Sequence, residues 1–226
     1  MNGATIFHFL LQENLDFKSF DWLKNGTLNE FEILVSVVLT QNTNWKNVLK
    51  ALVNVKAANI TTLEHIERLP NADLALLIKP SGFYNTKAKR IKALSSAILK
   101  DFQNLENFKK NVSRQWLLNV KGLGYESVDS ILNYLCEREI LVVDTYTQRL
   151  ALALGYEFEN YEDLREFFQS GVENEQEKLC ERLDCKMELY ELYQIFHALI
   201  LTFCKEYFKG KCISEKGKEI LQKLKA

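Results

Sequence analysis

A single acidic side chain, Asp144, stands between the apolar run 140–143 and a stretch of helical spacing that ends at Gly155. An aspartate at a helix start most often acts as a cap, because its oxygens accept hydrogen bonds from the free N–H groups of the first turn. A carboxylate fixed there can also stabilise a positive charge that develops on a bound molecule. Taken alone, Asp144 is open to both interpretations.

A glycine-containing turn lies some twenty residues before this aspartate. Gly122-Leu123-Gly124 separates the short helix expected over 113–120 from a following helix with almost no linker. Glycines in such a turn permit positive φ and close approach of another backbone, and the N–H groups of the next helix can hold a phosphate oxygen. A simple corner between two helices would need the same glycines, so the turn alone does not decide between the two.

Two further segments complete a pattern. They are Leu39-Thr40-Gln41-Asn42-Thr43 and Pro80-Ser81-Gly82-Phe83-Tyr84-Asn85-Thr86-Lys87-Ala88. With Val120-Lys121-Gly122-Leu123-Gly124 and Val143-Asp144-Thr145, in this order, they resemble the helix-hairpin-helix DNA glycosylase superfamily, whose best-known member is endonuclease III. The resemblance runs from Phe31 to about Gly155 and is faint beyond, where it is limited mainly to 197–201.

The resemblance implies a role for each matched position. Asp144 would be the catalytic carboxylate, Gln41 would fill the space that an extruded nucleotide leaves, and Phe83 would wedge into the base stack. Residues 120–124, which include Lys121, Gly122 and Gly124, would hold a phosphate through backbone amides, with a monovalent cation on the hairpin carbonyls as a further implication. The stretch 79–100 has six basic residues and no acid, and we interpret it, Lys87 included, as a surface that contacts phosphates.

The expected fold is all-α, because no segment alternates strictly between apolar and polar residues and several repeat with helical spacing. The resemblance implies two helical domains with a DNA-binding groove and base pocket between them. One would span 28–138 and carry the hairpin, and the other would join 1–27 to 139–226 and carry the catalytic aspartate.

Composition sets limits on partners and location. The 226 residues are 47% apolar and 26% charged, and the net charge of −1 gives no hint of a nucleic-acid partner, so any basic surface must be local. No stretch reaches the roughly 18 apolar residues of a membrane span, and the apolar run 6–11 is too short for a signal peptide. We expect the protein to be located in the cytoplasm, associated with a nucleoid of the bacterial type, and to be a monomer.

Two departures from the endonuclease III pattern narrow the expected activity. Members with lyase activity carry a lysine nucleophile two residues after the second hairpin glycine, whereas Gly124 is followed by Tyr125 and Glu126. A carboxylate cannot form an imine, so we expect a hydrolase without lyase activity. The family's four-cysteine iron–sulfur loop is also missing, because nothing after Cys212 supplies the further thiolates, and we expect neither a cluster nor any other metal cofactor.

The pattern is most similar to the short 3-methyladenine DNA glycosylases of this superfamily. An N-methylated purine is cationic, so its glycosidic bond is already weakened, and stacking on an aromatic ring stabilises the base. Trp45 is the first candidate ring and Trp22 the second, with His197 near the base pocket, although each could equally belong to a core. The expected partner is double-stranded DNA that contains damaged bases. The alternatives are an endonuclease III-type lyase for oxidised pyrimidines, or a hairpin module that binds DNA without cleaving it.

Overall fold

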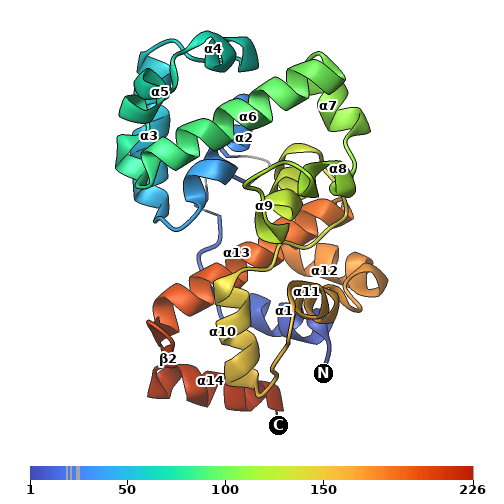
Figure 1. Ribbon diagram of the computed structural model, residues 1–226. Coiled ribbons are helices and arrows are strands. Elements are labelled where there is room, and N and C mark those ends of the chain that lie inside the picture. The colour runs from blue at the N-terminus through green and yellow to red at the C-terminus, as the bar shows by residue number, and fades with distance from the viewer. Residues whose placement is uncertain (19, 21, 24–25, 226) are drawn as a thin grey trace. The chain divides into compact units, whose positions relative to one another are not determined.

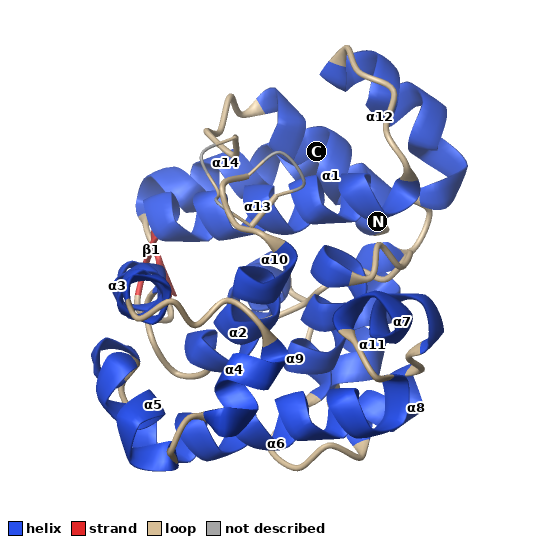
Figure 2. Cartoon of the chain, turned by 90° about the horizontal axis from the view of Figure 1, so that it is seen from above, coloured by secondary structure: helices blue, strands red, loops and turns tan. Residues whose placement is uncertain are grey.

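The regular structure is almost entirely helical (Figures 1 and 2). The computed structural model describes every residue except 19, 21, 24, 25 and 226. Within this part of the chain, strands are limited to one antiparallel pair of two-residue strands, β1 (Phe208–Lys209) and β2 (Cys212–Ile213). The expected all-α class is confirmed, and the strand pair escaped prediction because two residues are too few to show an alternating pattern.

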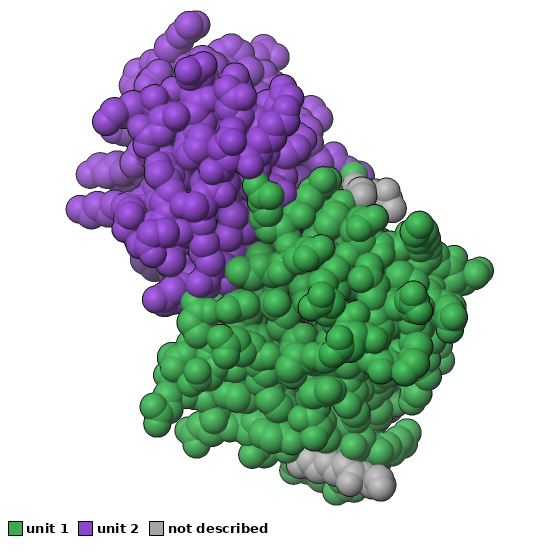
Figure 3. All heavy atoms as spheres, turned by 90° about the vertical axis from the view of Figure 1, so that its right-hand side faces the viewer, with its two compact units in different colours: residues 1–26, 137–226 green, residues 27–136 purple. Residues whose placement is uncertain are grey.

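The chain divides into two compact units (Figure 3). Unit 1 consists of residues 1–26 and 137–226, and unit 2 of residues 27–136. The ranges expected from the sequence were 1–27 with 139–226, and 28–138. Of the helices in the described residues, none is both long and apolar enough to cross a membrane.

Unit 2 is built around one long helix, α6 (Tyr84–Phe102). Its apolar face, with Ala88, Ile91, Leu94 and Ile98, is buried, and burial of each large aliphatic side chain stabilises the unit by about 1.5–3 kcal/mol. This face packs against α2, α4, α5 and α7. The other elements of the unit are α2 (Glu30–Thr40), α3 (Trp45–Ala57), α4 (Leu63–Arg68), α5 (Asn71–Leu77), the 3₁₀ turn η1 (Lys79–Ser81), α7 (Leu105–Asn111), α8 (Arg114–Leu118), α9 (Tyr125–Ser130) and the π-helical turn η2 (Ile131–Leu135).

Unit 1 is built around α13 (Leu189–Tyr207), most of whose residues are buried. A helix that is apolar nearly all round needs neighbours on several sides. Here α1 (Gly3–Gln12), α10 (Thr145–Leu154) and α12 (Gln176–Leu183) pack on it, and α10 lies beside α13 in Figure 1. The unit also contains α11 (Tyr161–Gln169), the 3₁₀ turn η3 (Glu173–Glu175) and α14 (Glu215–Lys225).

Candidate active site and nucleic-acid interface

Asp144 is the N-cap of α10, and its two oxygens have different surroundings. Oδ1 accepts hydrogen bonds from the backbone N–H groups of Tyr146 and Thr147, both at 2.9 Å, and from the Thr147 hydroxyl at 3.2 Å. Oδ2 lies 3.7 Å from Nε2 of His197. The side chain is only 12% exposed. The cap therefore fixes one oxygen and leaves the other directed toward the imidazole.

Two aromatic rings continue the cluster from His197, which belongs to α13. The ring of Trp22 lies against His197, with centroids 5.6 Å apart, and Phe20 lies against Trp22 at 4.9 Å. Trp22 and His197 are both buried. The structure thus brings together Asp144, Trp22 and His197, three of the residues that the sequence nominated for the active site.

The electrostatics of this cluster favour an ionised Asp144. Burial raises the pKa of the carboxyl, but His197 and the hydrogen bonds from Thr147 outweigh it and hold the pKa below its usual value. Burial also raises the pKa of the Cys204 thiol to about 12, and the charge of Asp144 adds to this effect. At neutral pH the site therefore holds a carboxylate beside an uncharged thiol.

Lys205 is a second charged group in this cluster, and sequence analysis missed it. Burial lowers the pKa of Lys205, whereas the Asp144 carboxylate raises it, and the ammonium lies 5.0 Å from the centre of the Phe20 ring. The only signal in the sequence is that position 205 lies eight residues after His197, which is near two helical turns. Residues 205–225 carry charges of both signs, a pattern typical of a solvated surface, so the sequence alone does not point to an active-site role for Lys205.

The glycine turn between α8 and α9 forms the expected helical hairpin. Gly122 has φ +97°, and an added Cβ there would lie 2.7–2.8 Å from the Arg90 side chain, so both conformation and packing require glycine. Gly124 has an ordinary φ of −101° and nothing within 4 Å of an added Cβ. Lys121 is exposed. Gly124 is the N-cap of α9, a position where glycine is common, and the space beside its Cα is open among the described residues.

Gln41, at the C-terminal end of α2, is anchored to this hairpin. Its Nε2 donates to the carbonyl of Gly122 at 3.1 Å and to the hydroxyl of Ser127 at 3.0 Å, while its Oε1 accepts from Arg90 at 2.6 Å. Arg90 is half-buried, and one of its N–H groups is used in this contact. These three hydrogen bonds hold the Gln41 amide within unit 2 when no DNA is bound, and sequence analysis did not foresee them.

Phe83 stands at the tip of the turn between η1 and α6. Its backbone is left-handed (φ 45°, ψ 28°), and its ring is 71% exposed. A left-handed conformation for a bulky residue is uncommon, and so is a phenyl ring with so much exposed surface. Both features suit a side chain that inserts into another molecule.

Lys87 does not contact phosphates, and on this point the sequence interpretation was wrong. Its side chain is 1% exposed, and Nζ donates to the carbonyls of Leu39 and Ser81 at 2.8 and 2.6 Å. Burial, with the charge of Arg90, lowers its pKa to about 8. Lys92 likewise donates to the carbonyls at the end of α4. The basic stretch is therefore no continuous surface; Lys79, Lys89 and Lys100 are its exposed members.

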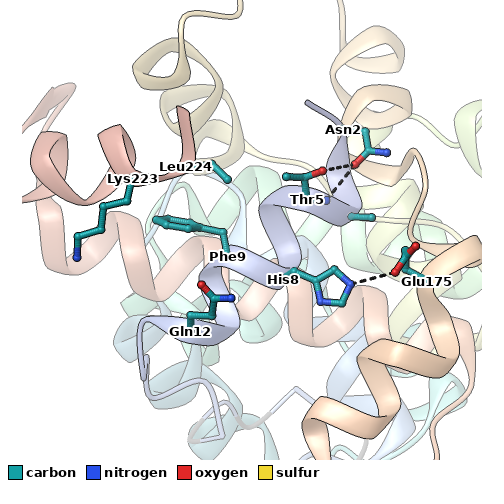
Figure 4. Close-up of a pocket in the computed structure, with 9 residues that line it drawn as sticks. Asn2, Thr5, His8, Phe9, Gln12, Glu175, Lys223 and Leu224 are labelled. Carbon is teal, nitrogen blue, oxygen red and sulfur yellow. Dashed lines mark hydrogen bonds and ion pairs between the residues drawn. The ribbon is translucent and has the colours of Figure 1, made fainter. Parts of the chain in front are cut away.

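Trp45, the first candidate ring from the sequence, belongs to unit 2, where it is half-buried at the start of α3 and is not part of the cluster around Asp144 that the structure describes in unit 1. A cavity of about 490 Å³ opens elsewhere, in unit 1, beside α1 and α14 (Figure 4). It is lined by polar groups that include Thr5, His8 and Glu175 and holds none of the predicted site residues. Among the residues that are described, no three His, Cys, Asp or Glu side chains are grouped so as to hold a metal ion.

Comparison with known proteins identifies the family. Residues 35–174 match the family described as HhH-GPD superfamily base excision DNA repair protein. A Methanocaldococcus jannaschii protein named as a candidate DNA repair glycosylase is 34% identical over 192 residues, which are 82% of this chain and 81% of that protein.

Solved structures agree with this match. The H. pylori 3-methyladenine DNA glycosylase MagIII, bound to 1,N6-ethenoadenine, has a TM-score of 0.86 and 40% identity, over 92% of this chain and all of that one. A trapped endonuclease III–DNA covalent intermediate shares the fold, with a TM-score of 0.67 and 18% identity, over 97% of this chain and 99% of that one. The chain therefore belongs to the HhH-GPD superfamily of base excision DNA repair proteins and is a DNA glycosylase of the endonuclease III-like type.

Proposed function

We propose that this glycosylase extrudes alkylated purines of the 3-methyladenine type from duplex DNA and hydrolyses their glycosidic bond without lyase activity. The observation that carries the proposal is the buried carboxyl of Asp144 at the start of α10, with Nε2 of His197 3.7 Å from its second oxygen and the Trp22 ring against the His197 ring. Support comes also from the H. pylori relative of 40% identity, a 3-methyladenine DNA glycosylase bound to 1,N6-ethenoadenine.

The chemistry requires one bond to break and one to form. The C1′–N9 bond breaks with its electron pair passing to the purine, which neutralises the positive charge of an N3-alkylated base. Water adds through its oxygen to C1′, and its proton passes to the carboxylate of Asp144 or to solvent. The carboxylate would therefore have two tasks, to stabilise the positive charge that develops on the sugar and to accept the proton of the water. Oδ2 of Asp144 suits both tasks, because Oδ1 already accepts three hydrogen bonds.

The cationic base needs a partner that favours positive charge. A desolvated cation over an aromatic ring gains roughly 2 kcal/mol, and the indole of Trp22 lies next to the catalytic cluster. Trp45 remains a predicted base contact on unit 2. A neutral base lacks this gain, which would help to select damaged nucleotides together with the lower cost of unstacking them.

DNA contact on unit 2 would use the hairpin and the turn before α6. The N–H groups at the start of α9, next to the open Gly124, are suited to a phosphate oxygen, and Lys121 adds an exposed charge. Phe83 is the proposed wedge and Gln41 the proposed filler of the emptied space. A monovalent cation at the hairpin stays a prediction; of the carbonyls concerned, Val120 and Gly122 each already accept a hydrogen bond.

The main alternative is a lyase that forms a Schiff base. Glu126 stands where the family's lyases carry their lysine, which disfavours this reaction, but the ammonium of Lys205 interacts with Asp144 and is the amine to be tested. Borohydride reduction during turnover would trap an imine as a covalent protein–DNA adduct. We expect no adduct; an adduct that disappears in Lys205→Met would establish a lyase and name its nucleophile.

The decisive experiment is incubation of the purified protein with methylated duplex DNA, followed by chromatography of the released bases. We expect 3-methyladenine in the soluble fraction and an intact DNA backbone at the abasic site. A parallel incubation uses oxidised duplex DNA: release of oxidised pyrimidines from it, with no release from methylated DNA, would favour an endonuclease III-type enzyme. Tight binding to both substrates with no release would favour a non-catalytic hairpin module. We further propose that the protein works in the cytoplasm as a monomer and without an iron–sulfur cluster.

A further inference from the structure

The buried ammonium of Lys87 joins two parts of unit 2 that are distant in sequence. One acceptor, the carbonyl of Leu39, is 48 residues away, and the other, that of Ser81, is six residues away. Leu39 lies in the last turn of α2, where carbonyls have no partner within the helix. The lysine therefore satisfies backbone groups that would otherwise be buried without a donor.

Each of the two acceptors lies close in sequence to a residue that is proposed to enter DNA. Leu39 is two residues before Gln41, and Ser81 is two residues before Phe83. These are the side chains expected to fill the emptied space and to wedge the stack. A single side chain thus ties the backbone that carries one of them to the backbone that carries the other.

A buried lysine is energetically unfavourable if its only role is to fill space in the core. Its charge is removed from water, and it lies in the first turn of α6, where the helix dipole disfavours a cation. The turn that it supports is itself strained and exposed, since Phe83 is left-handed and presents its ring to solvent. Such a turn keeps one conformation only if neighbouring groups hold it.

We propose that Lys87 is a positioning residue that fixes the separation of Gln41 and Phe83, so that both can enter the duplex together. The proposal rests on the proposed function, because it takes these two side chains to be the ones that enter DNA. It assigns to Lys87 no contact with base, sugar or phosphate.

The test compares Lys87→Met with a matched control on the same helix. Lys92 also donates from Nζ to two backbone carbonyls, those of Glu67 and Leu69, but these lie at the end of α4, away from both inserting residues. Lys92→Met therefore removes the same kind of contact, from a less buried site. The readout is the single-turnover rate of 3-methyladenine release from duplex DNA divided by the rate from the same strand without its complement.

We expect Lys87→Met to lower this duplex to single-strand ratio by about tenfold or more, because a small misplacement of inserting groups matters only where a stack must be opened. Lys92→Met should leave the ratio within twofold of the unsubstituted protein. In a Phe83→Ala background, Lys87→Met should lower the ratio by less than in the parent, because it acts through Phe83. An unchanged ratio in folded Lys87→Met, or an equal fall in both rates, would overturn the proposal.

A second variant serves if Lys87→Met does not fold, and a second measurement serves if the rates of base release cannot be compared. If Lys87→Met does not fold, Lys87→Gln, which reaches fewer carbonyls, takes its place and is judged by the same ratio. Amide hydrogen exchange measured over 36–43 and 79–86 gives a readout without activity: exchange should rise in both segments for Lys87→Met and in neither for Lys92→Met. If no DNA substrate yields a free base, the proposed function fails. If amide exchange in these two segments is unchanged in Lys87→Met, the positioning role of Lys87 is refuted.

Discussion

Replacing Asp144 by asparagine separates the two tasks that the structure gives this carboxylate. As the N-cap of α10 it accepts hydrogen bonds through Oδ1, and as the proposed catalytic group it supplies negative charge through Oδ2. Asparagine keeps a side-chain oxygen that can accept the same bonds and is as good a cap as aspartate. Asparagine lacks the negative charge of aspartate, whereas alanine removes both the cap and the charge.

The expected magnitudes differ for the two tasks. Loss of a cap costs about 0.5–2 kcal/mol, which for a protein of this size lowers the melting temperature by roughly 1–8 °C, so Asp144→Ala should melt lower and Asp144→Asn close to the unsubstituted protein. Loss of the charge beside the sugar should slow base release by about 10² to 10⁴-fold in both variants, or roughly 3–5 kcal/mol.

The assay is single-turnover release of alkylated purines, followed by chromatography, with DNA affinity measured on the same preparations. Asp144→Asn should bind methylated duplex DNA as the parent does and release almost no base. A variant that is stable, binds DNA and releases bases at the parent rate would refute the reasoning, because the carboxylate would then be a cap and nothing more.

Three further predictions follow from described contacts. His197→Leu removes the largest of the interactions that together outweigh burial at Asp144, so the pKa of the carboxyl should rise and the acidic limb of the kcat–pH profile should move to higher pH. The stability that the carboxylate adds is present above about pH 4, where Asp144 would be ionised in the unfolded chain, and is lost as pH falls through the lowered folded pKa. Phe83→Ala should change the free energy of unfolding by less than about 0.5 kcal/mol, since the ring is exposed, yet slow release from duplex DNA about tenfold, and an unchanged rate would exclude the wedge. Arg114→Met should cost about 3–5 kcal/mol in urea unfolding, because the buried Asp129 loses its bidentate partner, and Arg114→Met with Asp129→Leu should recover part of that loss.

Helix positions were predictable where local signals agreed. The short helix expected over 113–120 is observed as α8, and Asp144 caps the helix expected to end at Gly155, which is observed as α10. Asn71 is a residue type that often caps helices, but the structure places it inside α5, after Pro70, without a side-chain cap bond. Competing signals one residue apart cannot be ranked from spacing alone, because the outcome depends on packing that spacing does not describe.

The roles of charged residues were less predictable. Lys87 and Arg90 lie in a run of basic residues that looks like a surface, yet one is buried and the other binds Gln41. Their partners come from α2, more than forty residues earlier, and a one-dimensional pattern does not show which lysine such a neighbour will meet. Lys205 escaped notice for the same reason, since its link to Asp144 exists only once α13 packs on α10.

The first helix of the chain must wait for its partners during synthesis. An added Cβ on Gly3 would lie 1.7 Å from the carbonyl of Phe168, and the amide of Ala4 donates to Ser170, so α1 is seated on residues made more than 160 positions later. Residues 27–136 form a compact unit of their own, and all of its residues are made before Asp144. The loop that joins α1 to its partners closes late and at an entropic cost. An unfinished chain would thus contain the whole hairpin segment before Asp144 and the residues that seat α1 have been made.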